Sequence, residues 1–141
     1  MDIQKDFMLY YPELGELKVL WFRETETELQ IAVSYNRPEV LCPFCKGVNN
    51  KEHGREAQRK RDRNLERKKV FFILSKRRFR CLDCNKVFTE PDELFGSGKR
   101  SSKRFRTYLG KRAAERDVRE VAIEEKVSVS MVRNCLHEVW L

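Results

Sequence analysis

The chain has 141 residues, of which 37% are charged and 40% hydrophobic, so it suffices for one ordinary domain or two very small ones with modest cores. Its longest apolar runs, residues 7–11 and 70–74, are far shorter than the roughly 20 residues that span a bilayer, and no signal peptide precedes them. The net charge of +8 and the five cysteines favour a cytoplasmic protein with an acidic partner over a membrane or secreted protein.

The first segment, residues 1–41, predicts a β-hairpin. Residues 7–11 precede Pro12 and indicate a short helix or a strand edge. From 17 to 22 and from 29 to 35 the pattern favours strands, because apolar and polar side chains alternate in the second of these stretches with a period of two. Residues 24–28 form the predicted hairpin tip. Pro38 ends the second strand, since proline lacks the amide that a ladder needs.

Two Cys-x-x-Cys pairs, Cys42 with Cys45 and Cys81 with Cys84, follow the hairpin and are separated by 35 residues. Such pairs place two sulfurs on one side of a tight turn, and two turns supply the four thiolates of a tetrahedral structural zinc site. The interval is longer than the usual 15 to 20 residues, but loop closure costs only logarithmically more entropy as a loop lengthens. We therefore predict one structural Zn²⁺; a redox dithiol or a disulfide is the alternative.

Between the cysteine pairs the pattern changes from polar to apolar. Residues 46–69 are basic and contain few apolar side chains, which predicts a loop with a strand edge at most. Residues 70–74, aromatic and β-branched, continue through 76–80 as a predicted strand that ends in the second pair. Residues 87–88 predict a short return strand, and Pro91 with Gly96 and Gly98 marks a linker.

Charge is unevenly distributed along the chain. Residues 1–41 hold 4 basic and 8 acidic residues (−4), residues 46–80 hold 14 and 4 (+10), and residues 81–141 hold 12 and 10 (+2). A basic centre beside an acidic start is typical of a polyanion-binding surface, although a charge run is often only a solvated face. The residues predicted to contact phosphates form two clusters: Arg59, Lys60 and Arg61, and Lys99, Arg100, Lys103 and Arg104.

The last segment, residues 101–141, predicts three short helices by its apolar spacing, the last of them capped by Ser128. Residues 117–136 have the layout of a helix-turn-helix, whose second helix presents its N-terminal residues to base edges in the major groove. The predicted outward residues are Val129, Ser130, Arg133, Asn134 and His137. Two positions depart from the usual pattern, since Lys126 replaces a glycine in the turn and Glu125 replaces a buried apolar residue; a three-helix structural cap is the alternative.

From residue 38 onward the order of motifs resembles the N-terminal part of bacterial insertion-sequence transposases of the ISL-three type. The residues that carry the resemblance are the first cysteine pair, His53-Gly54, the basic strand ending at Cys81, the second pair followed by residues 87–90, and the helix-turn-helix pattern. The resemblance implies a zinc finger and a helix-turn-helix ahead of an RNase-H-like catalytic domain. That catalytic domain is missing here, so we expect a truncated chain without enzymatic activity and assign no catalytic residue.

The sequence therefore predicts an α+β fold with three parts: a β-rich zinc-binding domain (1–90), a linker (91–100) and a helix-turn-helix domain (101–141). The expected function is sequence-specific recognition of the terminal inverted repeats of a transposon in double-stranded DNA, in a nucleoid-associated protein; a homodimer is compatible with it. The alternative is a stand-alone zinc-binding transcriptional regulator or an adaptor that contacts RNA or protein through the acidic hairpin.

Overall fold

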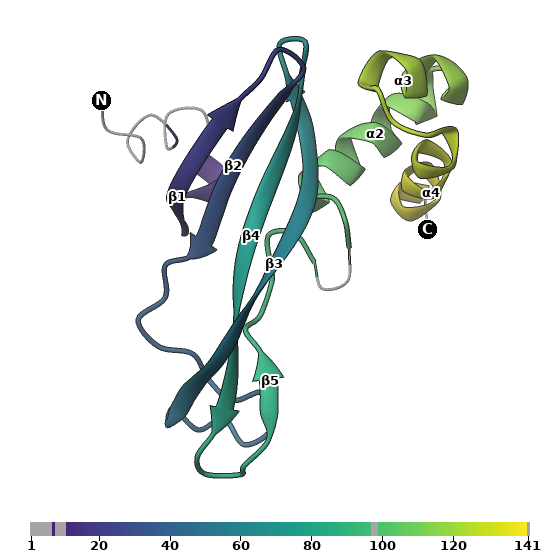
Figure 1. Ribbon diagram of the computed structural model, residues 1–141. Coiled ribbons are helices and arrows are strands. Elements are labelled where there is room, and N and C mark those ends of the chain that lie inside the picture. The colour runs from purple at the N-terminus through teal and green to yellow at the C-terminus, as the bar shows by residue number, and fades with distance from the viewer. Residues whose placement is uncertain (1–6, 8–10, 97–98, 141) are drawn as a thin grey trace.

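The computed structural model describes residues 7, 11–96 and 99–140, and within that part it is an α+β fold (Figure 1). A long mixed sheet carries three helices beside one end. The predicted element around residues 7–11 falls largely outside the described residues. The elements are η1 (Pro12–Leu14), β1 (Leu17–Glu24), β2 (Glu28–Tyr35), β3 (Asn50–Leu65), β4 (Lys68–Cys81), β5 (Val87–Thr89), α2 (Lys103–Glu115), α3 (Val118–Glu125) and α4 (Val129–Trp140).

Strand β4 is the centre of the sheet, whose order is β1-β2-β4-β3 with β5 paired to β4. β3 runs antiparallel along nearly all of β4 on one side. On the other side, β2 pairs in parallel with the first half of β4, and β5 pairs antiparallel with Arg78 to Arg80. The sheet is consequently elongated, with the two cysteine turns at one end and the helices near the other (Figure 1).

The β1–β2 hairpin confirms the prediction made from alternation. At its tip the Thr25 hydroxyl accepts hydrogen bonds from the amides of Thr27 (3.3 Å) and Glu28 (3.0 Å). This is the usual way in which a threonine side chain fixes a turn. The strands that sequence placed at 70–80 and 87–88 are also present, as β4 and β5.

The prediction that residues 46–69 form a loop is wrong, because β3 occupies 16 of them. Its sequence has no apolar alternation, since it is an edge strand and most of its side chains face solvent. Regular pairing with β4 supplies the hydrogen bonds that propensity would not predict, and only Glu52/Gly54 and Asp62/Leu65 interrupt the register. Gly54 lies at the first interruption with φ of +144°, a conformation that side chains disfavour.

Aromatic rings fill the core of the β part. Phe72, which is fully buried, meets Phe7 and Tyr11 edge-on at 6.2 and 5.5 Å, and Phe95 at 5.5 Å. Phe95 belongs to the segment predicted as a linker. So does Asp92, whose carboxylate accepts a 2.7 Å hydrogen bond from the Tyr35 hydroxyl and helps to raise the pKa of that phenol, mainly an effect of burial. Residues 91–96 thus pack into the β part.

The helical part has its own core and begins where predicted. Ser102 caps α2 by accepting from the amide of Phe105 at 3.2 Å, and Ser128 caps α4 by accepting from Met131 at 3.1 Å. Cys135 is buried, and burial raises the pKa of its thiol to about 11. The buried cluster comprises Phe105, Leu109, Ala113, Val121, Ala122, Val132 and Cys135. No helix in the described part of the chain is both long and apolar enough to cross a membrane.

Gly110 sets the distance between α2 and α4. A Cβ placed on it would lie 2.5 Å from the carbonyl oxygen of Cys135 and would strike the Val139 side chain. Any other residue would therefore push the two helices apart.

Hydrogen bonds from β3 tie the helical part to the sheet. The amide of Arg61 donates to Arg100 (2.7 Å) and its carbonyl accepts from Ser102 (2.9 Å), a parallel bridge outside the main sheet. Next to it, the buried Asp62 carboxylate accepts from the Ser102 hydroxyl (2.6 Å) and from Arg104. These residues hold α2, and with it the three-helix unit, against the end of β3.

Candidate metal centre and basic groove

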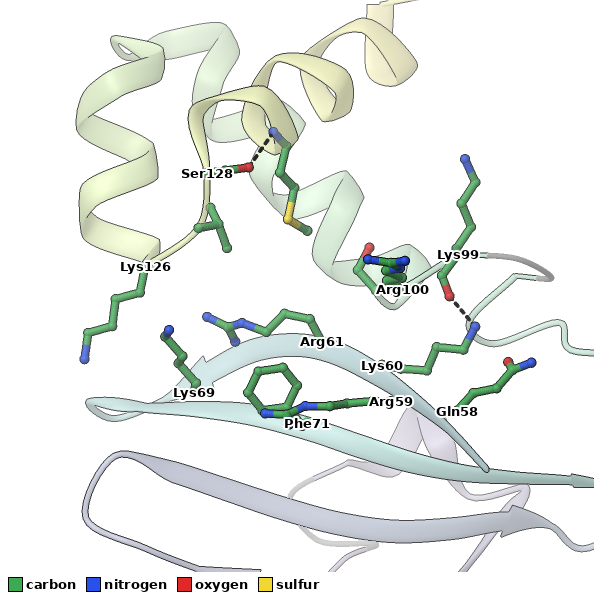
Figure 2. Close-up of a pocket in the computed structure, with 13 residues that line it drawn as sticks. Gln58, Arg59, Lys60, Arg61, Lys69, Phe71, Lys99, Arg100, Lys126 and Ser128 are labelled. Atoms are coloured by element: carbon green, nitrogen blue, oxygen red, sulfur yellow. Dashed lines mark hydrogen bonds between the residues drawn. The ribbon is translucent and has the colours of Figure 1, made fainter. Parts of the chain in front are cut away.

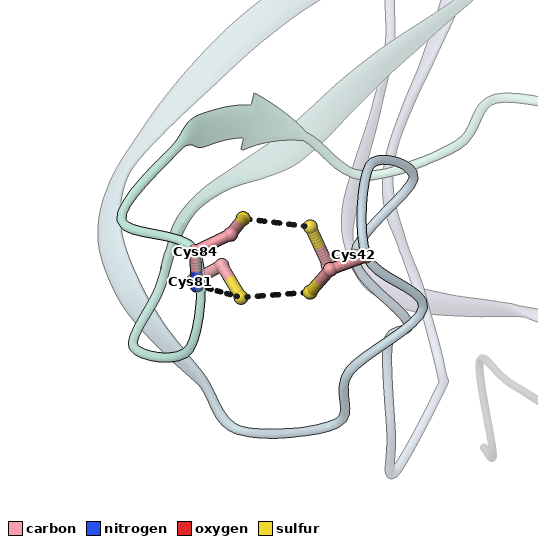
Figure 3. A group of neighbouring side chains, drawn as sticks. Cys42, Cys81 and Cys84 are labelled. Atoms are coloured by element: carbon pink, nitrogen blue, oxygen red, sulfur yellow. Dashed lines mark hydrogen bonds between the residues drawn. The ribbon is translucent and has the colours of Figure 1, made fainter.

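Four cysteine thiols converge at the far end of the sheet (Figure 3). Cys42 and Cys45 come from the loop after β2, and Cys81 and Cys84 from the end of β4 and the turn behind it. The four sulfur atoms all lie within 4.8 Å of one another, with 3.7 Å between Cys42 and Cys84 and 3.5 Å between Cys45 and Cys81. They could hold one metal ion.

The two turns share the same backbone geometry. In the first, the amide of Lys46 donates to the Cys42 carbonyl (2.9 Å), and in the second the amide of Asn85 donates to the Cys81 carbonyl (2.8 Å). Lys46 and Asn85 both have positive φ, 63° and 64°. Gly47 completes the first turn, and a Cβ there would lie 2.6 Å from the Asp83 carboxylate.

The donor set fits a tetrahedral metal. A thiolate lies about 2.3 Å from Zn²⁺, so two thiolates of a tetrahedron are about 3.8 Å apart, close to the sulfur separations seen here. Backbone amides support the sulfurs, as Phe44 donates to Cys42 and Gly47 to Cys45, each at 3.4 Å. Burial opposes ionisation of the Cys42 thiol, but the hydrogen bonds from the Cys45 and Phe44 amides outweigh it and lower the pKa to about 7.

The outward face of α4 presents four of the five residues predicted to face DNA. Ser130, Arg133, Asn134 and His137 are exposed on the side opposite the buried Val132 and Cys135. The prediction for Val129 is wrong, because it is half-buried and packs against the helical core.

The first predicted phosphate-binding cluster divides between surface and interior. Arg59 is exposed, stacks on the Phe71 ring at 3.7 Å and pairs with Glu28 at 3.0 Å. Lys60 and Arg61, by contrast, are buried, so the structure contradicts their prediction as phosphate contacts. Alternation along the strand turns Lys60 inward.

Each buried cation is satisfied inside the protein. Lys60 donates to the carbonyls of Gly96 (3.3 Å) and Lys99, and lies 3.7 Å from the Asp92 carboxylate. Arg61 lies over Phe105 at 5.1 Å and donates to the carbonyl of Glu125 at 3.0 Å. Lys60 thus connects β3 to the segment that precedes α2, and Arg61 connects β3 to the end of α3.

The second cluster divides in the same way. Lys99, Arg100 and Lys103 are exposed. Arg104 is half-buried, where it pairs with Asp62 and lies over the Tyr11 ring at 4.8 Å. Arg104 therefore contacts the β part, and its predicted contact with phosphate stays a prediction.

A groove of about 810 Å³ lies between the sheet and the start of α4 (Figure 2). Strands β3 and β4 form one wall with Arg59, Lys69 and Phe71. The opposite wall comes from the α3–α4 turn and the first turn of α4, and Lys99 and Arg100 close one side. The groove brings together three exposed residues of the predicted clusters, Arg59, Lys99 and Arg100, and two cations outside those clusters, Lys69 and Lys126.

Comparisons of the chain with protein-family models, with curated proteins and with solved structures find no match.

Lys69 and Lys126 had only a partial signal in the sequence. Lys69 belongs to a basic run whose side chains could not be assigned to either face while the segment was taken for a loop. Lys126 stood out as a non-glycine in the predicted turn, and it does have a left-handed backbone, with φ of 58° and ψ of 46°. Its position opposite β4 depends on how the helical part packs against the sheet, and no local sequence pattern predicts that packing.

Proposed function

We propose that this chain is a sequence-specific binder of double-stranded DNA, in which α3 and α4 act as a helix-turn-helix and the four cysteines hold a structural zinc ion. The observation that carries the proposal is the exposed polar face at the start of a capped helix, with Arg133 and Asn134 together on it. Arginine pairs with guanine and asparagine with adenine through two hydrogen bonds each, so this face suits base edges in the major groove.

The turn between α3 and α4 supports the helix-turn-helix interpretation despite its unusual residues. Lys126 adopts the left-handed conformation that glycine commonly provides, and its amide closes α3 by donating to Ile123 at 3.3 Å. Glu125 is buried, where its carboxylate accepts from Tyr108 (2.8 Å) and Arg112 (2.9 Å). Both departures from the common pattern are thus compatible with a stable turn.

Zinc is the metal that this donor set favours. Four cysteine sulfurs with no open position for water make a closed structural site, and thiolates select zinc over the hard cations. The ion would lock the loop after β2 to the end of β4. Its role is to stabilise that end of the sheet, not to take part in chemistry.

The resemblance to ISL-three-type transposases makes terminal inverted repeats the proposed target. In that setting the chain supplies recognition and a catalytic domain would be a separate unit, so we expect binding without cleavage. A selection of duplexes from a random library with zinc-loaded protein tests the proposal. One enriched motif supports it, whereas uniform retention of all sequences contradicts it.

A second candidate function is a regulator or adaptor that binds a protein through β1. Leu20, Trp21 and Phe22 are consecutive and 46 to 48% exposed, an unusual concentration of large apolar side chains on a surface. Replacing all three by Ser separates the two functions, since DNA selection should survive the change and a protein contact should not.

A further inference from the structure

The groove between the sheet and the helical part is lined by cations and apolar side chains that base recognition by α4 does not use. Its walls come from the sheet and from the α3–α4 turn, so it exists only because β3 holds the helical part in place. It opens beside α4, and the residues that line it include no carboxylate. Two properties of its lining, the free charge and the apolar floor, together indicate what it binds.

Three cations at the groove have no neutralising partner in the described part of the chain. Among the described residues no carboxylate lies within 4.0 Å of Lys69, Arg100 or Lys126, and the Lys126 ammonium donates to the carbonyl oxygen of Arg67 at 2.8 Å. Arg59 adds a further charge, partly offset by Glu28 at 3.0 Å. Cations that converge without counter-charges raise the local concentration of polyanions.

The floor between these cations is apolar. Phe71 lies on the strand wall and Val127 and Met131 on the turn and helix, all three half-buried. The Arg59 guanidinium carbon lies over the Phe71 ring, 3.7 Å from its centroid (Figure 2). Phosphates alone would leave this floor without a contact. A nucleobase would use it, because bases stack on aromatic rings and on guanidinium planes.

We propose that the groove binds a segment of single-stranded polynucleotide, with phosphates on Lys69, Arg100 and Lys126 and a base against Phe71 and Met131. In a paired duplex the bases are stacked inside the helix, so only an unpaired strand can present a base and a phosphate to the same groove. This site goes beyond duplex recognition by α4 and does not depend on it.

The test measures binding of a fluorescent oligo(dT) of about 15 nucleotides and of a random-sequence duplex of the same length, as a function of salt. Lys69→Gln, Arg100→Gln and Lys126→Gln are combined in one variant. The control variant combines Lys18→Gln, Arg23→Gln and Lys51→Gln. These substitutions remove the same charge as the groove variant, but from exposed residues outside the groove. Phe71→Leu keeps an apolar side chain but removes the ring. Circular dichroism establishes that each variant is folded.

For single strands each neutralised phosphate contributes about 0.7 to the log–log salt slope, so the groove variant should lower that slope by about 2. Phe71→Leu should weaken oligo(dT) binding about tenfold with an unchanged slope. The control should change binding much less.

Equal losses on duplex and single strand, with no effect of Phe71→Leu, would show that the groove holds a duplex backbone and would overturn the proposal. So would groove variants that behave like the control. Failure here leaves the duplex motif selected through α4 intact, whereas failure of α4 recognition leaves oligo(dT) binding intact.

Discussion

Lys60 and Arg59 are adjacent basic residues, but the structure predicts very different effects on folding stability when each is substituted. Arg59 is exposed at the groove, and Lys60 is 1% exposed beneath it. We consider Lys60→Met and Arg59→Met, each of which keeps an unbranched side chain and removes one charge. Lys60→Met should cost stability, and Arg59→Met should leave it nearly unchanged.

The magnitude follows from the partners of Lys60. Its loss leaves two carbonyls without their donor and leaves Asp92 with one cation, Lys76, at 3.6 Å. The Asp92 Oδ2 atom accepts no hydrogen bond from any described group, so its charge depends on these two ammonium groups. Breaking a buried ion pair costs roughly 3–5 kcal/mol, and the lower value of about 3 applies because Lys76 remains. The exposed Arg59–Glu28 pair contributes about 1 kcal/mol at most.

Urea denaturation followed by circular dichroism measures both variants. With an m-value of about 2 kcal/mol per molar, 3 kcal/mol lowers the midpoint by about 1.5 M for Lys60→Met. Arg59→Met should shift it by less than about 0.5 M. If the two variants are equally stable, Lys60 is not held in the interior as described, and the contacts of Asp92, Gly96 and Lys99 with β3 are wrong.

Three further predictions concern other parts of the molecule. Chelation of zinc, or Cys81→Ser, should unfold the cysteine end of the sheet and lower the melting temperature, because metal binding and folding are coupled; purified protein that contains no zinc by metal analysis would contradict this. Gly110→Ala should destabilise by about 2 kcal/mol in urea titrations, since separation of α2 from α4 outweighs the gain of about 1 kcal/mol in helix propensity; a stabilised variant would contradict it. Burial, opposed by the Ser102 hydroxyl, raises the pKa of Asp62 from 3.8 to about 6. The folded state therefore holds this proton more tightly, and stability relative to Asp62→Asn should fall by up to roughly 3 kcal/mol between pH 4 and pH 7, whereas a difference that grows with pH would contradict it.

The elements that sequence predicted correctly are those with a strong local signal. The β1–β2 hairpin, β4 and the capped start of α4 each combine periodicity with a defined boundary, such as the turn at Thr25 or the cap at Ser128. The cysteine cluster was predictable for a different reason, since the Cys-x-x-Cys spacing itself places two sulfur atoms on the same side of a turn. These signals lie within a few residues of the feature they predict.

The elements that sequence missed depend on pairing across the fold. β3 reads as a polar loop, and it becomes a strand because β4 offers an unpaired edge beside it. Once it is a strand, alternation turns Lys60 inward and leaves Arg59 outside, which divides a charge run that the sequence treated as one surface. The partners that make Arg61 and Asp62 tolerable in the interior, Glu125 and Ser102, lie at least 40 residues away.

The central claim, that α4 reads base edges, is tested most directly by titrating variants against two duplexes. One duplex carries the motif selected from a random library by wild-type protein, and the other is a scrambled sequence. Arg133→Ala and Asn134→Ala should each lose about 1 to 3 kcal/mol on the selected duplex and little on the scrambled one. Lys103→Ala, an exposed cation at the start of α2, is the control and should weaken both duplexes equally. Equal losses on both duplexes for Arg133→Ala and Asn134→Ala, or no loss on either, would contradict the account.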